Sequence, residues 1–285
     1  MSRPTIFAIL SFVTLYLWGG LAHAATPLID GATILRGTVI EGGMIFARTV
    51  PGSRVMLDNT SIDPSPGGFF AIGFHRDSDA PLALIIQHPS GAPRTTILHP
   101  TQRNYKIQRI DGLASNMVTP PQAVIDRIRA DSAAVRAARS TTPQSLEAVP
   151  EPDWLNGFDW PATGRISGIY GSQRILNGKP RQPHYGIDIA APTGTPVRAP
   201  ADGVITLVKD LYYSGWTIMM AHGAGINSGF LHLDQAQVSE GDRVRRGTII
   251  GTVGSTGRST GPHLDWRIDW HGRRVDASLL APPMP

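Results

Sequence analysis

Histidines and aspartates at close spacing mark two segments of the sequence for metal or acid–base chemistry. His184 and Asp188 lie four residues apart in a stretch with a preceding proline and a glycine, which we expect to be extended, with both side chains on one face. His263 and Asp265 alternate with apolar residues, so strand periodicity again puts both on one face. An imidazole and a carboxylate that converge in this way can bind a metal ion. A hydrolytic zinc ion needs three protein ligands and an open position.

Each of these pairs also has a simpler interpretation. Taken alone, His184 and Asp188 could be an unrelated pair in a turn, and only the presence of a second cluster in the same segment favours a site. His222 precedes a glycine and is predicted to be structural, at the end of a strand. His271 lies beside a Gly-Arg-Arg turn and is predicted to be a surface residue.

The elements around these residues are predicted to be short strands. Residues 154–285 contain β-branched runs between glycine turns, such as Gly203–Val208, Trp216–Met220 and Thr248–Gly254. This pattern predicts a largely antiparallel β domain with almost no helix.

The first half of the chain has a different pattern. Residues 25–112 show strand-like runs separated by Pro/Gly turns, which predict a small β-sandwich-like domain. Residues 113–153 contain apolar positions at helical spacing among arginines, followed by a proline-rich stretch. They predict one amphipathic helix and a linker. The expected fold class is therefore mainly β.

Residues 1–24 have the features of a signal peptide. Arg3 precedes an apolar run that ends in Ala22-His23-Ala24, a small-x-small cleavage site. The run is shorter than the roughly 20 apolar residues that cross a bilayer. We expect cleavage before Ala25, export, a periplasmic or envelope location, and no stable membrane span in the mature protein.

Composition narrows the class of protein further. The chain has 285 residues, 41% of them hydrophobic, which is ample for packed cores. It has no cysteine, so disulfides, Cys-based zinc fingers and thiol catalysis are excluded. A formal net charge of +4 without a long basic run fits an anionic polymer as partner but does not indicate nucleic acid.

Five segments, in order along the chain, resemble the catalytic domain of the lysostaphin and LytM group of zinc peptidases, the β-lytic metallopeptidases. These segments are Gly164–Arg174, His184–Ala190, Pro196–Val204, Phe230–Leu233 and Gly254–Leu264. The resemblance covers roughly residues 160 to 278. It implies a C-terminal domain of the LytM, or duplicated-hybrid-motif, type.

The resemblance also implies roles for the polar residues. His184 and Asp188 match two zinc ligands, whereas His232 and His263 match the two catalytic histidines that transfer a proton and stabilise the oxyanion. The family's third zinc ligand is a histidine, and Asp265 stands at that position. Aspartate is an acceptable zinc ligand, but its charge would help other divalent ions such as Mn²⁺ to compete.

The function implied is metal-dependent hydrolysis of peptide bonds in peptidoglycan stem or cross-bridge peptides, with one Zn²⁺ per site. Arg174 and Arg267 are candidates for pairing with substrate carboxylates.

The main alternative function is a degenerate LytM-type module that binds the cell wall or activates another wall hydrolase. Asp265, in place of the family's histidine, is the support for this alternative. A biotinyl-type carrier domain is a weaker alternative, because none of Lys106, Lys179 and Lys209 lies in a hairpin flanked by methionines. A regulatory protein partner remains open.

Overall fold

The computed structural model of the protein describes residues 29–112 and 120–284. The predicted signal peptide and the first part of the 113–153 segment lie outside these residues. Within the described ranges, no helix is long and apolar enough to cross a membrane.

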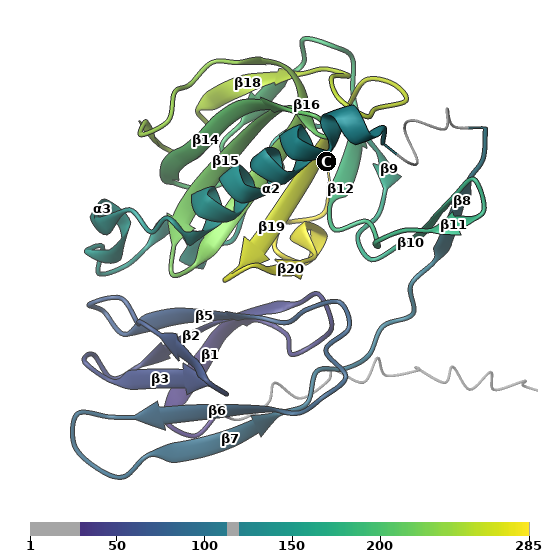
Figure 1. Ribbon diagram of the computed structural model, residues 1–285. Helices are drawn as coiled ribbons and strands as arrows, with labels where there is room; N and C mark the ends of the chain where they lie inside the picture. The colour runs from purple at the N-terminus through teal and green to yellow at the C-terminus, as the bar shows by residue number, and fades with distance from the viewer. Residues whose placement is uncertain (1–28, 113–119, 285) are drawn as a thin grey trace, which may run out of the picture.

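The N-terminal region is a sandwich of two antiparallel sheets (Figure 1). One sheet has the order β1-β2-β5 and the other the order β4-β3-β6-β7. Their strands are β1 (Ala32–Gly37), β2 (Met44–Thr49), β3 (Arg54–Leu57), β4 (Thr60–Ile62), β5 (Phe69–Gly73), β6 (Leu82–Gln87) and β7 (Arg94–Leu98). Strand β3 alternates exposed and buried residues, as a sheet with one face on a core requires.

The C-terminal region is built on one ten-stranded antiparallel sheet, as predicted. Its main path runs β17-β14-β15-β16-β19-β12-β9, with β13, β18 and β20 attached beside it. These strands are β9 (Arg165–Gly168), β12 (Ile187–Ala190), β13 (Pro196–Arg198), β14 (Gly203–Leu211), β15 (Gly215–Gly223), β16 (Ile226–Ala236), β17 (Arg243–Val244), β18 (Ile249–Val253), β19 (His263–Trp270) and β20 (Arg273–Val275).

Among the described residues, one long helix, α2 (Ile125–Ser140), lies across one face of this sheet (Figure 1). It is the predicted amphipathic helix, and its Ala138 packs in a small apolar cluster with Leu207, Leu211 and Met219 of β14 and β15. The other helices are one-turn elements: η1 (Gln122–Val124), α3 (Gln144–Glu147), η2 (Asp153–Asn156) and η3 (Ala277–Leu279). The proline-rich stretch is thus partly helical.

The two regions share one hydrophobic core. A continuous cluster of buried side chains runs from the sandwich into the large sheet, and Phe46 of β2 packs against Trp154 with ring centroids 5.4 Å apart. Strand β8 (Ile107–Ile110) pairs in parallel with β10 (Gln173–Leu176), which also pairs with β11 (Lys179–Pro180). The predicted boundary near residue 112 stays a prediction, and contacts across it are extensive.

Candidate metal and catalytic site

Two carboxylates meet because strands β12 and β19 pair in antiparallel register. Asp188 lies directly opposite Asp265 in this pairing. On β19, Leu264 and Trp266 are fully buried in the core, so Asp265 lies on the other face together with His263, as the strand periodicity predicts. Like charges directly opposite one another destabilise a strand pair unless a cation lies nearby.

The loop before β12 brings His184 to these carboxylates. The prediction that the whole His184–Asp188 stretch is extended is wrong at its start, because β12 begins only at Ile187. Backbone hydrogen bonds hold the loop instead: the N–H of Gly171 donates to the carbonyl of His184 at 2.7 Å, and the N–H of His184 donates to Ser172 at 2.9 Å. Proline and glycine in this segment break the strand and permit the loop.

His184 and Asp188 present buried polar atoms that lack hydrogen-bond partners. Among the described residues, neither ring nitrogen of His184 nor Oδ1 of Asp188 has such a partner. His184 Nε2 lies 2.9 Å from Asp188 Oδ1, and ligand atoms of these residues and Asp265 lie within 4.8 Å of one another. Buried polar atoms without a hydrogen bond are costly, and one cation between the three side chains would satisfy one ring nitrogen of His184 together with the carboxylate oxygens. One imidazole and two carboxylates are a chemically suitable donor set for Zn²⁺ or Mn²⁺.

Two arginines hold the carboxylates in place. Arg174 Nη2 lies 3.3 Å from Asp188 Oδ2, which leaves Oδ1 of this carboxylate facing His184. Arg267 donates to both oxygens of Asp265, with Nη2 2.5 Å from Oδ2. Burial would raise the pKa of Asp265, but the Arg267 guanidinium and the neighbouring His184 hold it well below its usual range. Both arginines, considered above as partners of substrate carboxylates, thus pair with the protein's own.

Two glycines make room for these carboxylates. A Cβ at Gly186 would lie 2.0 Å from Asp265 Oδ1, and a Cβ at Gly168 would lie 2.1 Å from Asp188 Oδ2. Only a residue without a side chain fits at either position. The backbone therefore closes around the two carboxylates from both sides.

His232 and His263 lie beside this cluster with their rings 4.8 Å apart between centroids. Nδ1 of His232 lies 2.8 Å from the carbonyl oxygen of Thr256, and Nδ1 of His263 lies 2.7 Å from that of Gly261. Since a carbonyl only accepts, each Nδ1 carries the hydrogen and each Nε2 is left as a proton acceptor. Burial lowers the pKa of His232, which favours this neutral form.

The backbone at His232 is itself unusual. Its φ is +63°, in the left-handed region that a non-glycine residue rarely adopts, and its N–H donates to the carbonyl of Ser214 at 2.8 Å. Such a conformation costs about 1–3 kcal/mol and persists where the surroundings impose it. The fold thus holds this imidazole in a fixed orientation.

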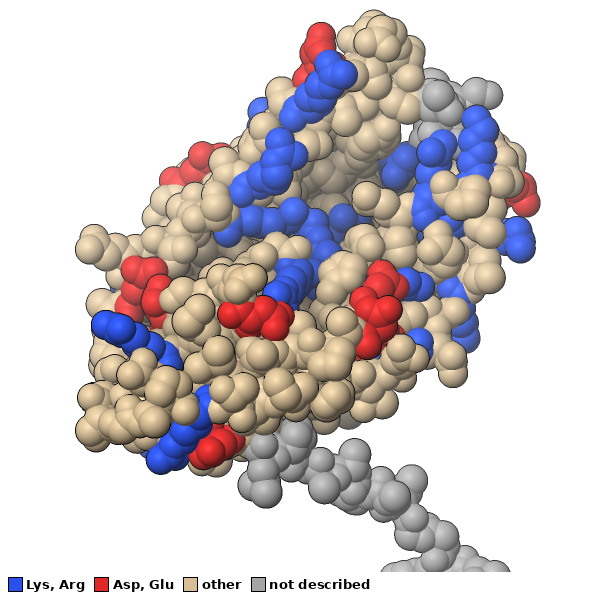
Figure 2. All heavy atoms as spheres, turned by 60° about the horizontal axis from the view of Figure 1, so that its bottom comes forward, with Lys and Arg blue, Asp and Glu red and all other residues tan. Residues whose placement is uncertain are grey.

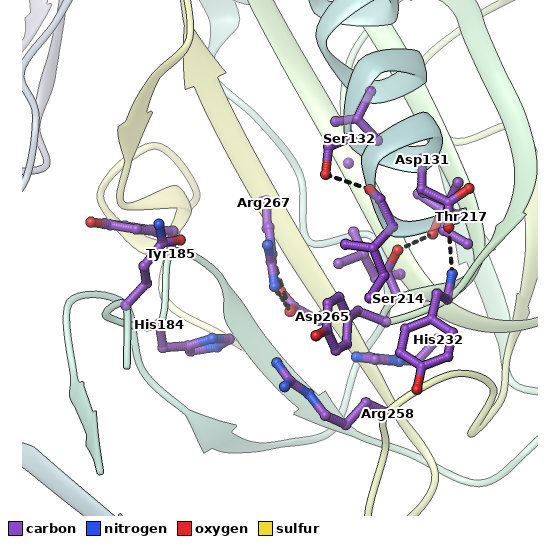
Figure 3. Close-up of a pocket in the computed structure, with 18 of the residues that line it drawn as sticks. Asp131, Ser132, His184, Tyr185, Ser214, Thr217, His232, Arg258, Asp265 and Arg267 are labelled. Atoms are coloured by element: carbon purple, nitrogen blue, oxygen red, sulfur yellow. Dashed lines mark hydrogen bonds and ion pairs between the residues drawn. The ribbon is translucent and has the colours of Figure 1, made fainter. Parts of the chain in front are cut away.

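The site opens into a cavity of about 750 Å³, which lies between the large sheet, the β10–β12 segment and α2. His184, His232, Arg258, Asp265 and Arg267 all line it, and Figure 3 shows them converging on the same space. Figure 2 shows that Lys and Arg side chains gather in the hollow on this face. The site can therefore admit an extended chain beside the histidines.

Strand periodicity could have predicted that Arg267 pairs with Asp265, whereas we expected it to pair with a substrate carboxylate. Arg267 shares the face of His263 and Asp265 because it is two residues further along the same strand. No comparable signal marks the carbonyls of Thr256 and Gly261, which belong to loops and act through their backbone.

Comparisons with known proteins relate the C-terminal region to a family of peptidases. The profile of Peptidase family M23 matches residues 182–277. The DD-carboxypeptidase/endopeptidase Mpg of Neisseria meningitidis is 48% identical over 102 residues, which are 36% of this chain and 24% of Mpg. The peptidoglycan DD-endopeptidase ShyA of Vibrio cholerae is 39% identical over 121 residues, 42% of this chain and 28% of ShyA. The chain thus matches only about a quarter of the length of these relatives.

A likeness to a crystal structure extends over both regions. A protein of Pseudomonas aeruginosa assigned as a peptidase M23 superposes with a TM-score of 0.66 and 25% identity, over 85% of this chain and 95% of that one. The sandwich, the helix and the large sheet therefore recur together. With the matched profile and the peptidase relatives, this confirms the resemblance drawn from the motifs: the chain carries a domain of peptidase family M23.

Proposed function

We propose that this protein is an exported, metal-dependent endopeptidase that hydrolyses peptide bonds in the stem or cross-bridge peptides of peptidoglycan. The observation that carries the proposal is the buried pair His184 Nε2 and Asp188 Oδ1, 2.9 Å apart and without hydrogen-bond partners among the described residues. The relatives named as DD-endopeptidases support peptidoglycan as the substrate class.

His184, Asp188 and Asp265 are the proposed ligands of one ion, with Zn²⁺ as the first candidate. When bound there, such an ion supplies Lewis-acid activation of water and of the scissile carbonyl. Arg267 offsets the charge of Asp265, so that the pair together carries no net charge, as a neutral histidine would. The aspartate is therefore compatible with an active site of this family.

His232 and His263 are the proposed proton-handling residues. With Nδ1 of each ring donating to a carbonyl, Nε2 of one can take a proton from the attacking water. Nε2 of the other, once protonated, can donate to the developing oxyanion. The fixed tautomers make both roles available without any rearrangement of the rings.

The remaining assignments are also proposals. A peptidoglycan substrate requires export, so residues 1–24 are proposed to be removed and the mature chain to act in the periplasm or cell envelope. The N-terminal sandwich is proposed to position the catalytic region. Arg76, just after β5, donates to the carbonyl of Gly171 at 2.7 Å, and the N–H of Gly171 donates to His184.

The direct test is digestion of purified peptidoglycan by protein loaded with one equivalent of Zn²⁺ or Mn²⁺. We expect soluble fragments whose masses reveal newly formed amino and carboxyl termini. Removal of the metal with a chelator is expected to stop release, and re-addition is expected to restore it. The His184→Ala variant is the matched control.

The rival function, a wall-binding or activating module, predicts a different result. Metal-loaded protein would then sediment with peptidoglycan but release no fragments. That outcome, with the fold intact by circular dichroism, would overturn the endopeptidase proposal.

A further inference from the structure

The floor of the cavity continues along β19 beyond the metal ligands. His263, Asp265, Arg267 and Asp269 occupy alternate positions of this strand, and the intervening residues are buried in the core. At about 3.4 Å per residue, Asp269 lies about 13 Å along the strand from Asp265. This distance matches about four residues of an extended peptide.

A second charged cluster surrounds Asp269. Its Oδ2 lies 3.0 Å from Nε of Arg139, on α2, and 3.4 Å from Nη1 of Arg274, on β20. The Asp269 side chain is only 1% exposed, whereas Arg139 and Arg274 retain 19% and 15% exposure. Both arginines line the cavity with partly exposed side chains, although Nε of Arg139 is buried against Asp269. One carboxylate behind two guanidinium groups leaves one positive charge directed at the cavity.

Arginines predominate in the surroundings of this charge. Of the described residues that line the cavity, seven are arginines and two, Asp131 and Asp265, are aspartates, and Arg174 and Arg267 pair with carboxylates of the protein. Burial, and to a smaller extent the nearby Arg139, lowers the pKa of Arg274 to about 9, although Asp269 and Asp265 act in the opposite direction. An anion that entered the cavity would relieve this electrostatic cost.

We propose that Arg139 and Arg274 bind a free carboxylate of the substrate, a few residues from the scissile bond. The ligand class is an acidic peptide, because two guanidinium forks match the planar, bidentate geometry of a carboxylate. This inference rests on the proposed function, since the peptide must extend from the metal site along β19. It makes Arg139 and Arg274 specificity residues of the peptidase.

The same contacts have a simpler interpretation, in which Arg139 only ties α2 to the sheet. Nδ2 of Asn227, on β16, donates to the carbonyl of Arg139 at 3.3 Å, so the helix is already held there by its backbone. A tether requires no exposed guanidinium and no excess of positive charge. The two interpretations differ in whether the preference for charged substrates depends on Arg139.

The test compares two forms of one cross-linked peptidoglycan peptide dimer, one with its carboxylates free and one with them converted to amides. For the wild type we expect kcat/KM to be about 10- to 100-fold higher on the free carboxylates, mainly through KM, as a charged hydrogen-bond pair implies. In Arg139→Gln and Arg274→Gln the preference falls to within about threefold, because kcat/KM falls much further on the free carboxylates than on the amidated dimer.

Arg127→Gln is the matched control. Arg127 is also on α2, but it pairs with Asp210 at 3.0 Å and does not line the cavity. We expect this variant to keep the full preference. Arg139→Lys, which keeps the charge but loses the fork, is expected to show an intermediate preference and covers the case in which Arg139→Gln does not fold.

Two results would overturn the proposal. The wild type could cleave both dimers equally, or Arg139→Gln and Arg139→Lys could lose thermal stability and activity on both dimers alike, as a tether predicts. Failure of the proposed function looks different, because neither dimer would then be cleaved by any variant.

Discussion

His184 and His222 both belong to the C-terminal region and are similarly buried, yet their environments are opposite. The imidazole of His222 is satisfied at both nitrogens: Nδ1 lies 2.8 Å from the carbonyl of Asp202, and Nε2 lies 2.8 Å from Ser228 Oγ. Both nitrogens of His184 lack a hydrogen-bond partner among the described residues, and the ring lies beside the carboxylates of Asp188 and Asp265. Burial alone therefore does not distinguish a structural histidine from a ligand, whereas the unfilled hydrogen-bonding capacity does.

The largest expected difference between these regions is in metal binding. His184→Ala is expected to lose bound metal and at least about 10³-fold in activity, since a catalytic ion supplies several kcal/mol of transition-state stabilisation. His222→Ala is expected to bind metal normally but to unfold more readily, because it leaves Ser228 and Asp202 unpaired. The metal content and the melting temperature of both purified variants are the measurements. Full metal occupancy in His184→Ala would contradict the assignment of His184 as a ligand.

The next largest effect separates ligands from proton-handling residues. His232→Ala and His263→Ala are expected to keep the metal and to lose about 10²- to 10⁴-fold in kcat. The measurement is turnover of peptidoglycan dimers alongside metal content. If His263→Ala loses metal as completely as His184→Ala, His263 is a ligand and the assignment is wrong.

A smaller effect tests the Asp265–Arg267 pair. Asp265→Ala is expected to weaken zinc binding, because a catalytic zinc ion is held by three protein ligands and only two would remain. Asp265→His alone restores the family's ligand but leaves Arg267 as an unpaired, partly buried cation beside the ion. The double variant Asp265→His/Arg267→Met is therefore expected to bind zinc more tightly than Asp265→His. Titration against a chromophoric chelator measures the zinc affinity of the wild type and of the three variants. Equal affinity of the wild type and Asp265→Ala would rule out Asp265 as a zinc ligand.

The last effect concerns the pH dependence of stability at His222, whose ring nitrogens are both hydrogen-bonded. Burial lowers the pKa of His222 from 6.5 to about 4, so the unfolded chain binds this proton more readily. Stability from this group is complete above about pH 6.5 and is lost as the pH falls toward 4, by about 3 kcal/mol. Urea unfolding between pH 7 and 4 is expected to show this dependence in the wild type and a shallower one in His222→Gln. Parallel curves for the two proteins would refute it.

The sequence predicted those features that depend on local periodicity. Alternation around Leu264 and Trp266 correctly placed Asp265 beside His263, and β-branched runs predicted the sheet. It could not predict that Arg139 reaches Asp269, 130 residues further along the chain, because tertiary packing of α2 determines that contact. It also missed that His184 precedes its strand, since the loop is held by bonds to residues 171 and 172.

The pairing of Asp188 with Asp265 also determines when the site can exist during the life of the chain. Seventy-seven residues separate these two carboxylates, and only the completed β12–β19 ladder makes them neighbours. A nascent chain that lacks β19 cannot bring Asp265 to His184 and Asp188. The order of strand synthesis thus delays assembly of this cluster until β19 has folded against β12.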